Sequence, residues 1–99
     1  MRFEWDREKN WINQKKHNGI AFESAAAVFD DPHVLFRRDR IVAGEQRWHA
    51  IGTAQEAVLL VVHVYRMESE NGEEEIIRII SARQASQRER RIYIQQAAE

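Results

Sequence analysis

Apolar and polar positions alternate at the start of the chain and then recur with the spacing of a helix. Residues 3–5 alternate in this way and lead into Asp6, a favoured helix N-cap, so we expect a short strand followed by a helix to about His17. Asn18 and Gly19 come next, and both tolerate the left-handed conformation that closes many helix C-termini. The pattern therefore predicts a strand and then a helix at the beginning of the chain.

A second helix is predicted where four apolar residues occupy one helical stripe. Their spacing of i, i+3, i+4 and i+7 brings them to one side of a helix, and we expect them to enter the core: Phe22, Ala25, Ala26 and Phe29. Residues 30–32, Asp-Asp-Pro, end this helix. The residue before a proline is pushed out of helical geometry, and the proline itself cannot continue the hydrogen-bond ladder.

Four further segments are predicted to be strands. Residues 33–38 and 47–53 alternate, and residues 58–67 form a long β-branched run that is typical of a central, buried strand. The Asn-Gly pair at 71–72 is a strong hairpin signal, because both central positions of a type I′ turn need a positive φ. We therefore expect residues 75–81 to pair antiparallel with 58–67, with acidic residues at the exposed tip of the hairpin.

A last helix is expected after Ser86, which has the form of a capping box with Glu89. The complete order is β-α-α, then an antiparallel sheet of about four strands, then a C-terminal helix. This order describes an α+β fold with helices packed on an antiparallel sheet. A chain of 99 residues is long enough to close one hydrophobic core, so we expect residues 1–99 to form a single domain.

Composition excludes several kinds of site. The chain has no cysteine, so it forms no disulfide, no thiolate metal site and no catalytic thiol. His33 and His49 stand in no metal-ligand spacing, and His63 lies within an apolar strand as a core histidine does, so we expect no metal and no cofactor. The 15 basic and 16 acidic residues nearly cancel, which argues against coating nucleic acid by bulk charge. Five arginines against one acid between residues 78 and 91 nevertheless predict a local basic site.

Nothing in the apolar pattern predicts export or membrane insertion. Residues 1–6 carry charges from the second position on and lack the apolar run of a signal peptide. The longest apolar stretch, residues 57–63, is far shorter than the roughly 20 residues that span a bilayer. We therefore expect a cytoplasmic protein that has no membrane partner.

Four stretches carry a resemblance to a known family, in that family's order and approximate spacing over nearly the whole chain. They are Phe3-Glu4-Trp5-Asp6 with Lys9 and Asn10, Lys16-His17 with Gly19-Ile20 and Phe22-Glu23, Gly44-Glu45-Gln46-Arg47 with Ile51-Gly52, and Arg78-Ile79-Ile80-Ser81-Ala82-Arg83 with Ala85, Glu89, Arg90 and Tyr93. The last stretch is the most specific. On these residues the chain resembles the BrnT family within the RelE-like group of toxins. It departs from the family's pattern at Asn18, which separates His17 from Gly19.

The resemblance implies a RelE-like α+β fold and the activity of a bacterial type II toxin. That activity is metal-independent endoribonuclease cleavage of RNA, which inhibits translation. The resemblance also implies a cognate ribbon-helix-helix antitoxin, similar to BrnA, which neutralises the toxin and binds the operon's promoter. Promoter DNA is then a partner of this chain only indirectly, through the antitoxin complex.

Metal-free cleavage of RNA requires cations around the phosphate that is cut. The neighbouring 2′-hydroxyl attacks the phosphorus centre, which gains negative charge, and arginine suits this charge because its planar fork donates two hydrogen bonds to phosphate oxygens. The candidates are Arg47, Arg78 and Arg83, each in a predicted strand or at its end. Arg78 and Arg83 are five positions apart, so in an uninterrupted strand their side chains point to opposite faces. We favour a strand that breaks near Ser81, with Arg83 turned by the approach to Ser86.

Proton transfer has several candidates, and the sequence leaves the choice among them open. His17 is one, because histidine gains and loses protons near neutral pH, and Glu45 is another. Lys16 is a candidate for a further cation at the same site. Arg88 and Arg91, on the exposed side of the expected terminal helix, are candidates for binding the RNA backbone or the antitoxin.

The same residues also admit non-catalytic interpretations. An arginine at the end of a strand is commonly a surface residue in a salt bridge, and Arg78 in that case pairs with the acids across the hairpin. The alternative function is a non-catalytic module that binds RNA or a protein partner in a regulatory complex. A third is a structural domain that only completes an antitoxin complex. RNA cleavage by the purified chain in EDTA distinguishes the nuclease from both.

Overall fold

The computed structural model describes residues 1–68 and 74–98. Its elements follow in the order β1 (Arg2–Glu4), α1 (Arg7–Lys16), α2 (Phe22–Ala25), the 3-10 helix η1 (Ala26–Asp30), β2 (Leu35–Val42), β3 (Glu45–Ala54), β4 (Ala57–Glu68), β5 (Glu74–Gln84) and α3 (Gln87–Ala97). The α+β fold class and the order of its elements are therefore as predicted. The expected Asn-Gly turn at 71–72 lies outside the described residues.

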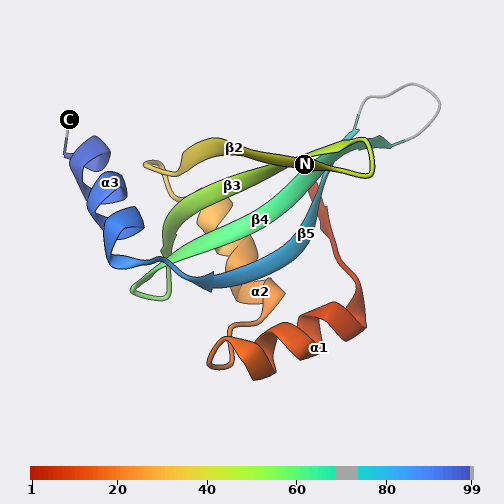
Figure 1. Ribbon diagram of the computed structural model, residues 1–99, viewed down its shortest axis with the longest axis horizontal. Helices are drawn as coiled ribbons and strands as arrows, with labels where there is room; N and C mark the ends of the chain where they lie inside the picture. Colours follow the sequence, from red (N-terminus) through yellow and green to blue (C-terminus); the bar gives the residue numbers. More distant parts are fainter. Residues whose placement is uncertain (69–73, 99) are drawn as a thin grey trace.

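The strands form one five-stranded mixed sheet in the order β1-β5-β4-β3-β2 (Figure 1). β5, β4, β3 and β2 pair antiparallel with their neighbours, which confirms the predicted antiparallel sheet of about four strands. β1 adds a fifth strand at the edge, where it pairs parallel with β5. The first and last strands of the chain therefore lie side by side, and Glu4 lies directly beside Arg78.

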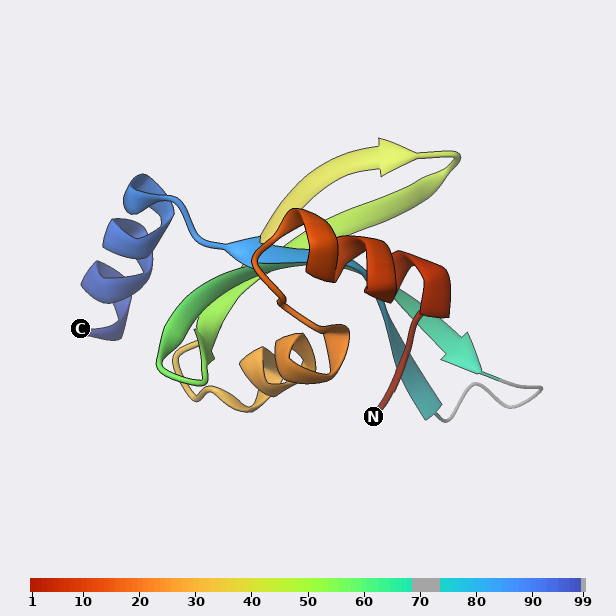
Figure 2. The same ribbon diagram turned by 90° about the horizontal axis from the view of Figure 1, so that it is seen from below.

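Helices cover one side of the sheet and leave much of the other side open. α2 and η1 pack on the covered side, which we call the helical face, and Figure 2 shows the β2–β3 hairpin curving away from that side. The core of the helical face contains apolar side chains from both layers: Phe22, Ala25, Val28, Ala50, Val61, Ile79 and Ala82. On the opposite side, which we call the open face, α3 covers one end by packing Tyr93 against Ile51 and Leu60.

The second helical segment ends at Asp30 as predicted, but its second half is tighter than an α-helix. α2 continues as the 3-10 helix η1, which has about three residues per turn. Fully buried residues accordingly recur every three positions, at Phe22, Ala25 and Val28. Phe22 and Ala25 thus lie in the core as predicted, whereas Ala26 and Phe29 are only half-buried and pack at its margin.

Both longer helices begin at the residues predicted to cap them. Asp6 Oδ1 accepts the backbone N–H groups of Glu8 at 2.9 Å and Lys9 at 3.1 Å. Ser86 and Glu89 form the expected capping box at the start of α3, each accepting a backbone N–H from the other. These contacts are local in sequence, which explains why the helix starts were predictable.

α1 lies along the edge of β5 and protects that edge through one side chain. Asn13 Nδ2 donates to Ala82 O at 2.7 Å, and Ala82 N donates to Asn13 Oδ1 at 3.1 Å. The side-chain amide thus satisfies the backbone groups that a neighbouring strand would otherwise pair. Asn13 Nδ2 also donates to Ile20 O at 3.0 Å, which ties the loop after α1 to the sheet. These bonds fix the segment of β5 that leads into Arg83.

Candidate active site

A β-bulge in β5 decides which side of the sheet Arg83 occupies. At this point β5 has one more residue than its partner β4, and the extra residue is Ile80. Side chains alternate along a strand, and one extra residue shifts that alternation by one position. Ile79 before the bulge and Ala82 after it both lie in the core of the helical face, so Arg78 and Arg83 both lie on the open face.

The expected strand break near Ser81 is therefore wrong, because β5 continues to Gln84. In a regular strand, Arg78 and Arg83 would point to opposite faces because they are five positions apart. The extra residue of the bulge brings them to the same face. No glycine or proline marks the bulge in the sequence, so no local signal indicated it.

Arg47 lies on the same open face. Continuing the pairing of β3 with β4 by one residue places Arg47 beside Val64, and Val64 pairs with Arg78 in β5. Arg47, Val64 and Arg78 thus form one row across three neighbouring strands. Adjacent strands lie about 4.8 Å apart, so the backbones of Arg47 and Arg78 are separated by roughly 10 Å with Val64 between them.

An ion-pair network connects Arg78 to Glu45. Arg78 Nη1 lies 3.5 Å from Glu4 Oε2, and Arg66 Nη1 lies 3.7 Å from Glu4 Oε1. Arg66 Nε in turn lies 3.4 Å from Glu45 Oε2, so the candidate Glu45 is held at the other end of the network. Among the described residues, the ion pair of Arg78 is with an acid of β1 and not with an acid of the β4–β5 hairpin. Sequence analysis identified neither Glu4 nor Arg66 as part of this site.

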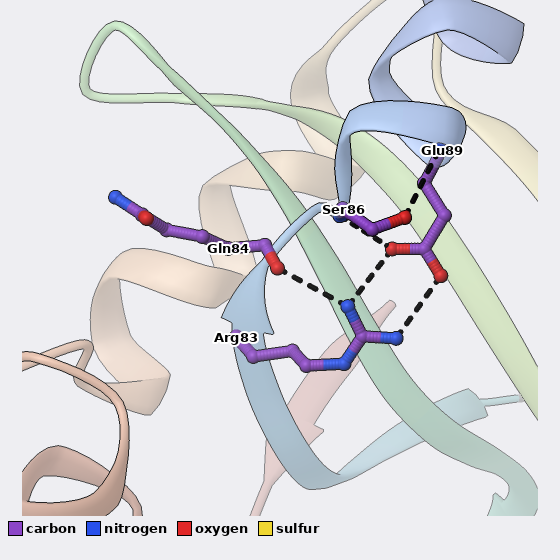
Figure 3. Close-up of polar contacts among 4 residues, drawn as sticks. All are labelled: Arg83, Gln84, Ser86 and Glu89. Carbon is purple, nitrogen blue, oxygen red and sulfur yellow. Dashed lines mark hydrogen bonds and ion pairs between the residues drawn. The ribbon is translucent and has the colours of Figure 1, made fainter.

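Arg83 is fixed by a two-pronged ion pair with Glu89 in the first turn of α3 (Figure 3). Arg83 Nη1 donates to Glu89 Oε1 at 2.8 Å and Nη2 donates to Oε2 at 3.0 Å, while Nη1 also donates to Gln84 O at 3.1 Å. The Arg83 hydrogen bonds, helped by the backbone N–H of Ser86, lower the pKa of Glu89 to about 2 although burial opposes the shift. The pairing with Glu89 also raises the pKa of Arg83, so the guanidinium stays charged.

The pair with Glu89 leaves one edge of the Arg83 guanidinium available. Three of its five N–H donors are used in the contacts above. The Nε–H and the second Nη2–H have no partner among residues 1–68 and 74–98, and they lie on the same edge of the planar group. Such an edge donates two parallel hydrogen bonds to a phosphate or carboxylate. Arg83 is therefore held rigidly while a two-donor edge remains free.

Lys16 and His17 stand at the end of α1 and line a hollow of about 190 Å³ at the edge of β5. Ile80 and Ser81 form part of the opposite wall of this hollow. The bulge that aligns Arg78 with Arg83 therefore also lies beside Lys16 and His17. Both candidates come close to the arginine-bearing strand, although they belong to a different element.

A histidine–aspartate pair also lies on the open face, and sequence analysis did not identify it. His49 follows Arg47 by two positions in β3, so both side chains point to the same face. His49 Nε2 lies 3.1 Å from Asp39 Oδ2 in β2. Burial raises the pKa of Asp39, but the backbone N–H of Arg40 and the charge and hydrogen bond of His49 outweigh burial and lower it. The spacing of Arg47 and His49 in a predicted strand could have indicated that their side chains share one face. No feature of the sequence indicated the contact of His49 with Asp39.

The remaining candidates lie on the surface of α3. Arg88 and Arg91 are exposed, and Arg91 lines a groove on the outer side of the helix with Gln87, Arg90, Ile94 and Gln95. Within the described ranges, no group of three or more histidine, aspartate or glutamate side chains is arranged to hold a metal ion. No helix in that part of the chain combines the length and apolar character needed to cross a membrane.

Comparison with known proteins gives a family for the chain. No curated protein sequence matches it. Residues 5–89 match the sequence model of a family described as the ribonuclease toxin, BrnT, of the type II toxin–antitoxin system. The match covers most of the chain, includes β2 to β5 with Arg47, Arg78 and Arg83, and confirms the resemblance noted in the sequence. The chain therefore belongs to the BrnT family of ribonuclease toxins of type II toxin–antitoxin systems.

Proposed function

We propose that this chain is an endoribonuclease that cuts RNA at the open face of its sheet and needs no metal ion to do so. The observation that carries the proposal is the bulge at Ile80, because it brings Arg78 and Arg83 to the face that also holds Arg47. Three arginines from two strands then lie on one face of the sheet. The description of the family as ribonuclease toxins supports the same activity.

The proposed reaction is attack of a ribose 2′-oxygen on the adjacent phosphorus. The P–O2′ bond forms as the P–O5′ bond breaks, which leaves a 2′,3′-cyclic phosphate and a free 5′-hydroxyl. The phosphorus centre gains negative charge on the way, and preorganised cations lower the energy of that state most effectively. Arg47 and Arg78 act from the two sides of Val64, while Arg83 offers its free Nε–Nη2 edge to phosphate oxygens.

The reaction also moves two protons, one from the 2′-hydroxyl and one to the 5′-oxygen. We propose His17 and Glu45 as candidates for these transfers and Lys16 as a further positive charge near the phosphate. The hollow that His17 and Lys16 share with Ser81 supports their approach to RNA bound across β5. Glu45 is held by Arg66, which belongs to the same network as Arg78.

In the cell, we propose that this activity inhibits translation until a cognate antitoxin blocks it. The antitoxin is a ribbon-helix-helix protein similar to BrnA, and promoter DNA is reached only through the antitoxin complex. Arg88 and Arg91 are proposed to bind RNA or antitoxin, because both are exposed on α3 and Arg91 borders a groove with the 54% exposed Ile94. Such a mixture of basic and apolar side chains suits an acidic, amphipathic segment of a partner.

The test is cleavage of a single-stranded RNA by the purified chain in EDTA. We expect products that end in 2′,3′-cyclic phosphate and 5′-hydroxyl, and no cut at a position where the ribose is replaced by 2′-deoxyribose. Removal of a group that stabilises transition-state charge costs about 100- to 1,000-fold in rate. The Arg78→Ala, Arg83→Ala double variant is therefore expected to lose at least about 1,000-fold.

The matched control is Arg7→Ala, which removes an exposed arginine at the start of α1 that has no part in the proposed site. It is expected to cleave at the rate of the unmodified chain. Full activity in the double variant contradicts the roles of Arg78 and Arg83. Tight binding of RNA without cleavage at several pH values selects the non-catalytic binding module instead.

A further inference from the structure

Two β-bulges face each other across the open face, and His49 lies between them. The first bulge, at Ile80, interrupts β5. The second interrupts β2, where the pairing with β3 shifts between Arg38 and Ile41. Bulges re-aim side chains and are frequent beside active sites. β2 and β5, which flank the central strands β3 and β4, are thus both distorted beside Arg47 and His49.

The bulge in β2 directs Asp39 onto the ring of His49. Asp39 Oδ2 lies 3.1 Å from His49 Nε2, and both side chains are partly buried, 29% and 21% exposed. Gln46 fastens the bulge, because its Nε2 donates to Asp39 O at 2.5 Å and to Arg47 O at 2.8 Å. The carboxylate is therefore a fixed partner, and the imidazole is held in one orientation.

We propose that His49, in place of the candidates His17 and Glu45, is the catalytic base of the ribonuclease and that Asp39 is its positioning residue, an assignment that rests on the function proposed above. With Nε2–H donated to Asp39, the neutral ring presents Nδ1 as an acceptor. Within residues 1–68 and 74–98, Nδ1 of His49 has no hydrogen-bond partner. His49 pairs with Val62, which in turn pairs with Ser81 beside the bulge of β5. This row is next to the row of Arg47, Val64 and Arg78. His49 and the two arginines therefore lie around the apolar side chains of Val62 and Val64.

In the proposed step, Nδ1 of His49 takes the proton of the ribose 2′-hydroxyl while O2′ bonds to phosphorus, and the P–O5′ bond breaks with its electron pair going to O5′. Solvent water supplies the proton that completes the 5′-hydroxyl, and His49 afterwards returns its proton to solvent. The imidazolium that results is stabilised by the carboxylate of Asp39, as a base is stabilised by an orienting acid in other hydrolytic sites.

Charged and titratable groups surround His49 on each packed element. Arg37, which pairs directly with His49, and Asp39 come from β2. Arg47 precedes it on β3, and His63 lies behind it in β4, within reach of its charge. Arg37 and Arg47 repel the positive charge of the imidazolium formed in this step, whereas the carboxylate of Asp39 attracts it.

The test is the pH dependence of RNA cleavage in EDTA from pH 5 to 9. For the unmodified chain we expect the rate to rise with pH through one ionisation and then level. His49→Gln keeps a donor for Asp39 but accepts no proton, so it is expected to lose about 100-fold or more in rate and the rising limb with it. Asp39→Asn leaves the imidazole in place and is expected to move the midpoint to lower pH. His33→Ala is the matched histidine control and is expected to cleave normally.

Several results overturn the assignment. They are a His49→Gln variant within about threefold of the unmodified rate, an Asp39→Asn variant with an unmoved midpoint, and a loss of the rising limb in His17→Gln alone. The midpoint shift in Asp39→Asn keeps the test decisive if His49→Gln folds poorly. An unmodified chain that cuts no RNA at any pH refutes the proposed function itself, which is a separate outcome.

Discussion

Replacing Glu89 by glutamine removes the negative charge that holds Arg83 while leaving the shape of the side chain almost unchanged. The amide oxygen of glutamine still accepts the backbone N–H of Ser86, so the capping box survives. What disappears is the charge in the two-pronged contact with Nη1 and Nη2 of Arg83. The substitution therefore isolates the ion pair that joins α3 to β5.

The size of the effect follows from the pKa of Glu89. A fall from 4.5 to about 2 corresponds to about 3 kcal/mol in favour of the folded chain. The Arg83 side chain is 40% exposed, so solvent screens the pair and reduces this value. We expect Glu89→Gln to lower the free energy of unfolding at pH 7 by about 1 to 2 kcal/mol, or the melting temperature by about 5 to 15 °C.

The depressed pKa of Glu89 also predicts how the effect of Glu89→Gln on stability changes with pH. Because the pKa of Glu89 is depressed in the folded chain, the stabilisation is complete above pH 4.5, the unfolded value, and is lost as the pH falls toward 2. Urea denaturation of both proteins at pH 7 and pH 3 measures the difference, which is expected to shrink at pH 3.

Glu8→Gln is the control, since Glu8 stands in the first turn of α1 and feels a similar helix dipole without an arginine partner among the described residues. Equal free energies of unfolding of Glu89→Gln and Glu8→Gln at pH 7 contradict a stabilising ion pair between Glu89 and Arg83.

Two further predictions concern stability. Gly52→Ala places a Cβ 2.9 Å from Val28 Cγ1 and 3.2 Å from Val28 O, so η1 must shift. We expect urea denaturation to show a free energy of unfolding that is lower by about 2 to 3 kcal/mol. An unchanged midpoint of denaturation contradicts this close approach. Burial lowers the pKa of His63 from 6.5 to about 4, so the unfolded chain takes up a proton first as the pH falls. Stability is expected to fall by up to about 3 kcal/mol between pH 6.5 and pH 4, and to fall less in His63→Phe; parallel losses in both proteins exclude this cause.

The parts of the fold that sequence analysis predicted are those fixed by local interactions. Asp6 caps α1 and Ser86 caps α3 because each side chain bonds to backbone groups two or three positions away. The long β-branched run of β4 and the alternation of β3 likewise depend on neighbours in the sequence. The fold class and the order of elements follow from these segments.

The parts that sequence analysis missed depend on contacts between distant residues. Asn13 binds the backbone of Ala82, 69 positions away, and no property of either residue alone indicates the contact. The bulge at Ile80 is a matter of register between β4 and β5, and it occurs without glycine or proline.

A candidate site could be proposed from residue types in the sequence, whereas its geometry could not. Arg47, Arg78 and Arg83 were chosen for the chemistry of guanidinium and phosphate, but their common face depends on the bulge of β5. The contact of His49 with Asp39 depends in the same way on the bulge of β2. Glu89 was identified from the sequence as a capping residue, and its contact with Arg83 was found only in the fold.

NMR shows directly whether the three arginines of the open face bind one stretch of RNA. A short single-stranded RNA in which every 2′-hydroxyl is methylated has no nucleophile and therefore stays intact. On its addition, we expect changes in the Nε–H signals of Arg47, Arg78 and Arg83, while the backbone signals of α2 and η1 stay in place. Changes confined to the helical face, with the three arginine signals unmoved at saturation, exclude RNA binding by these arginines.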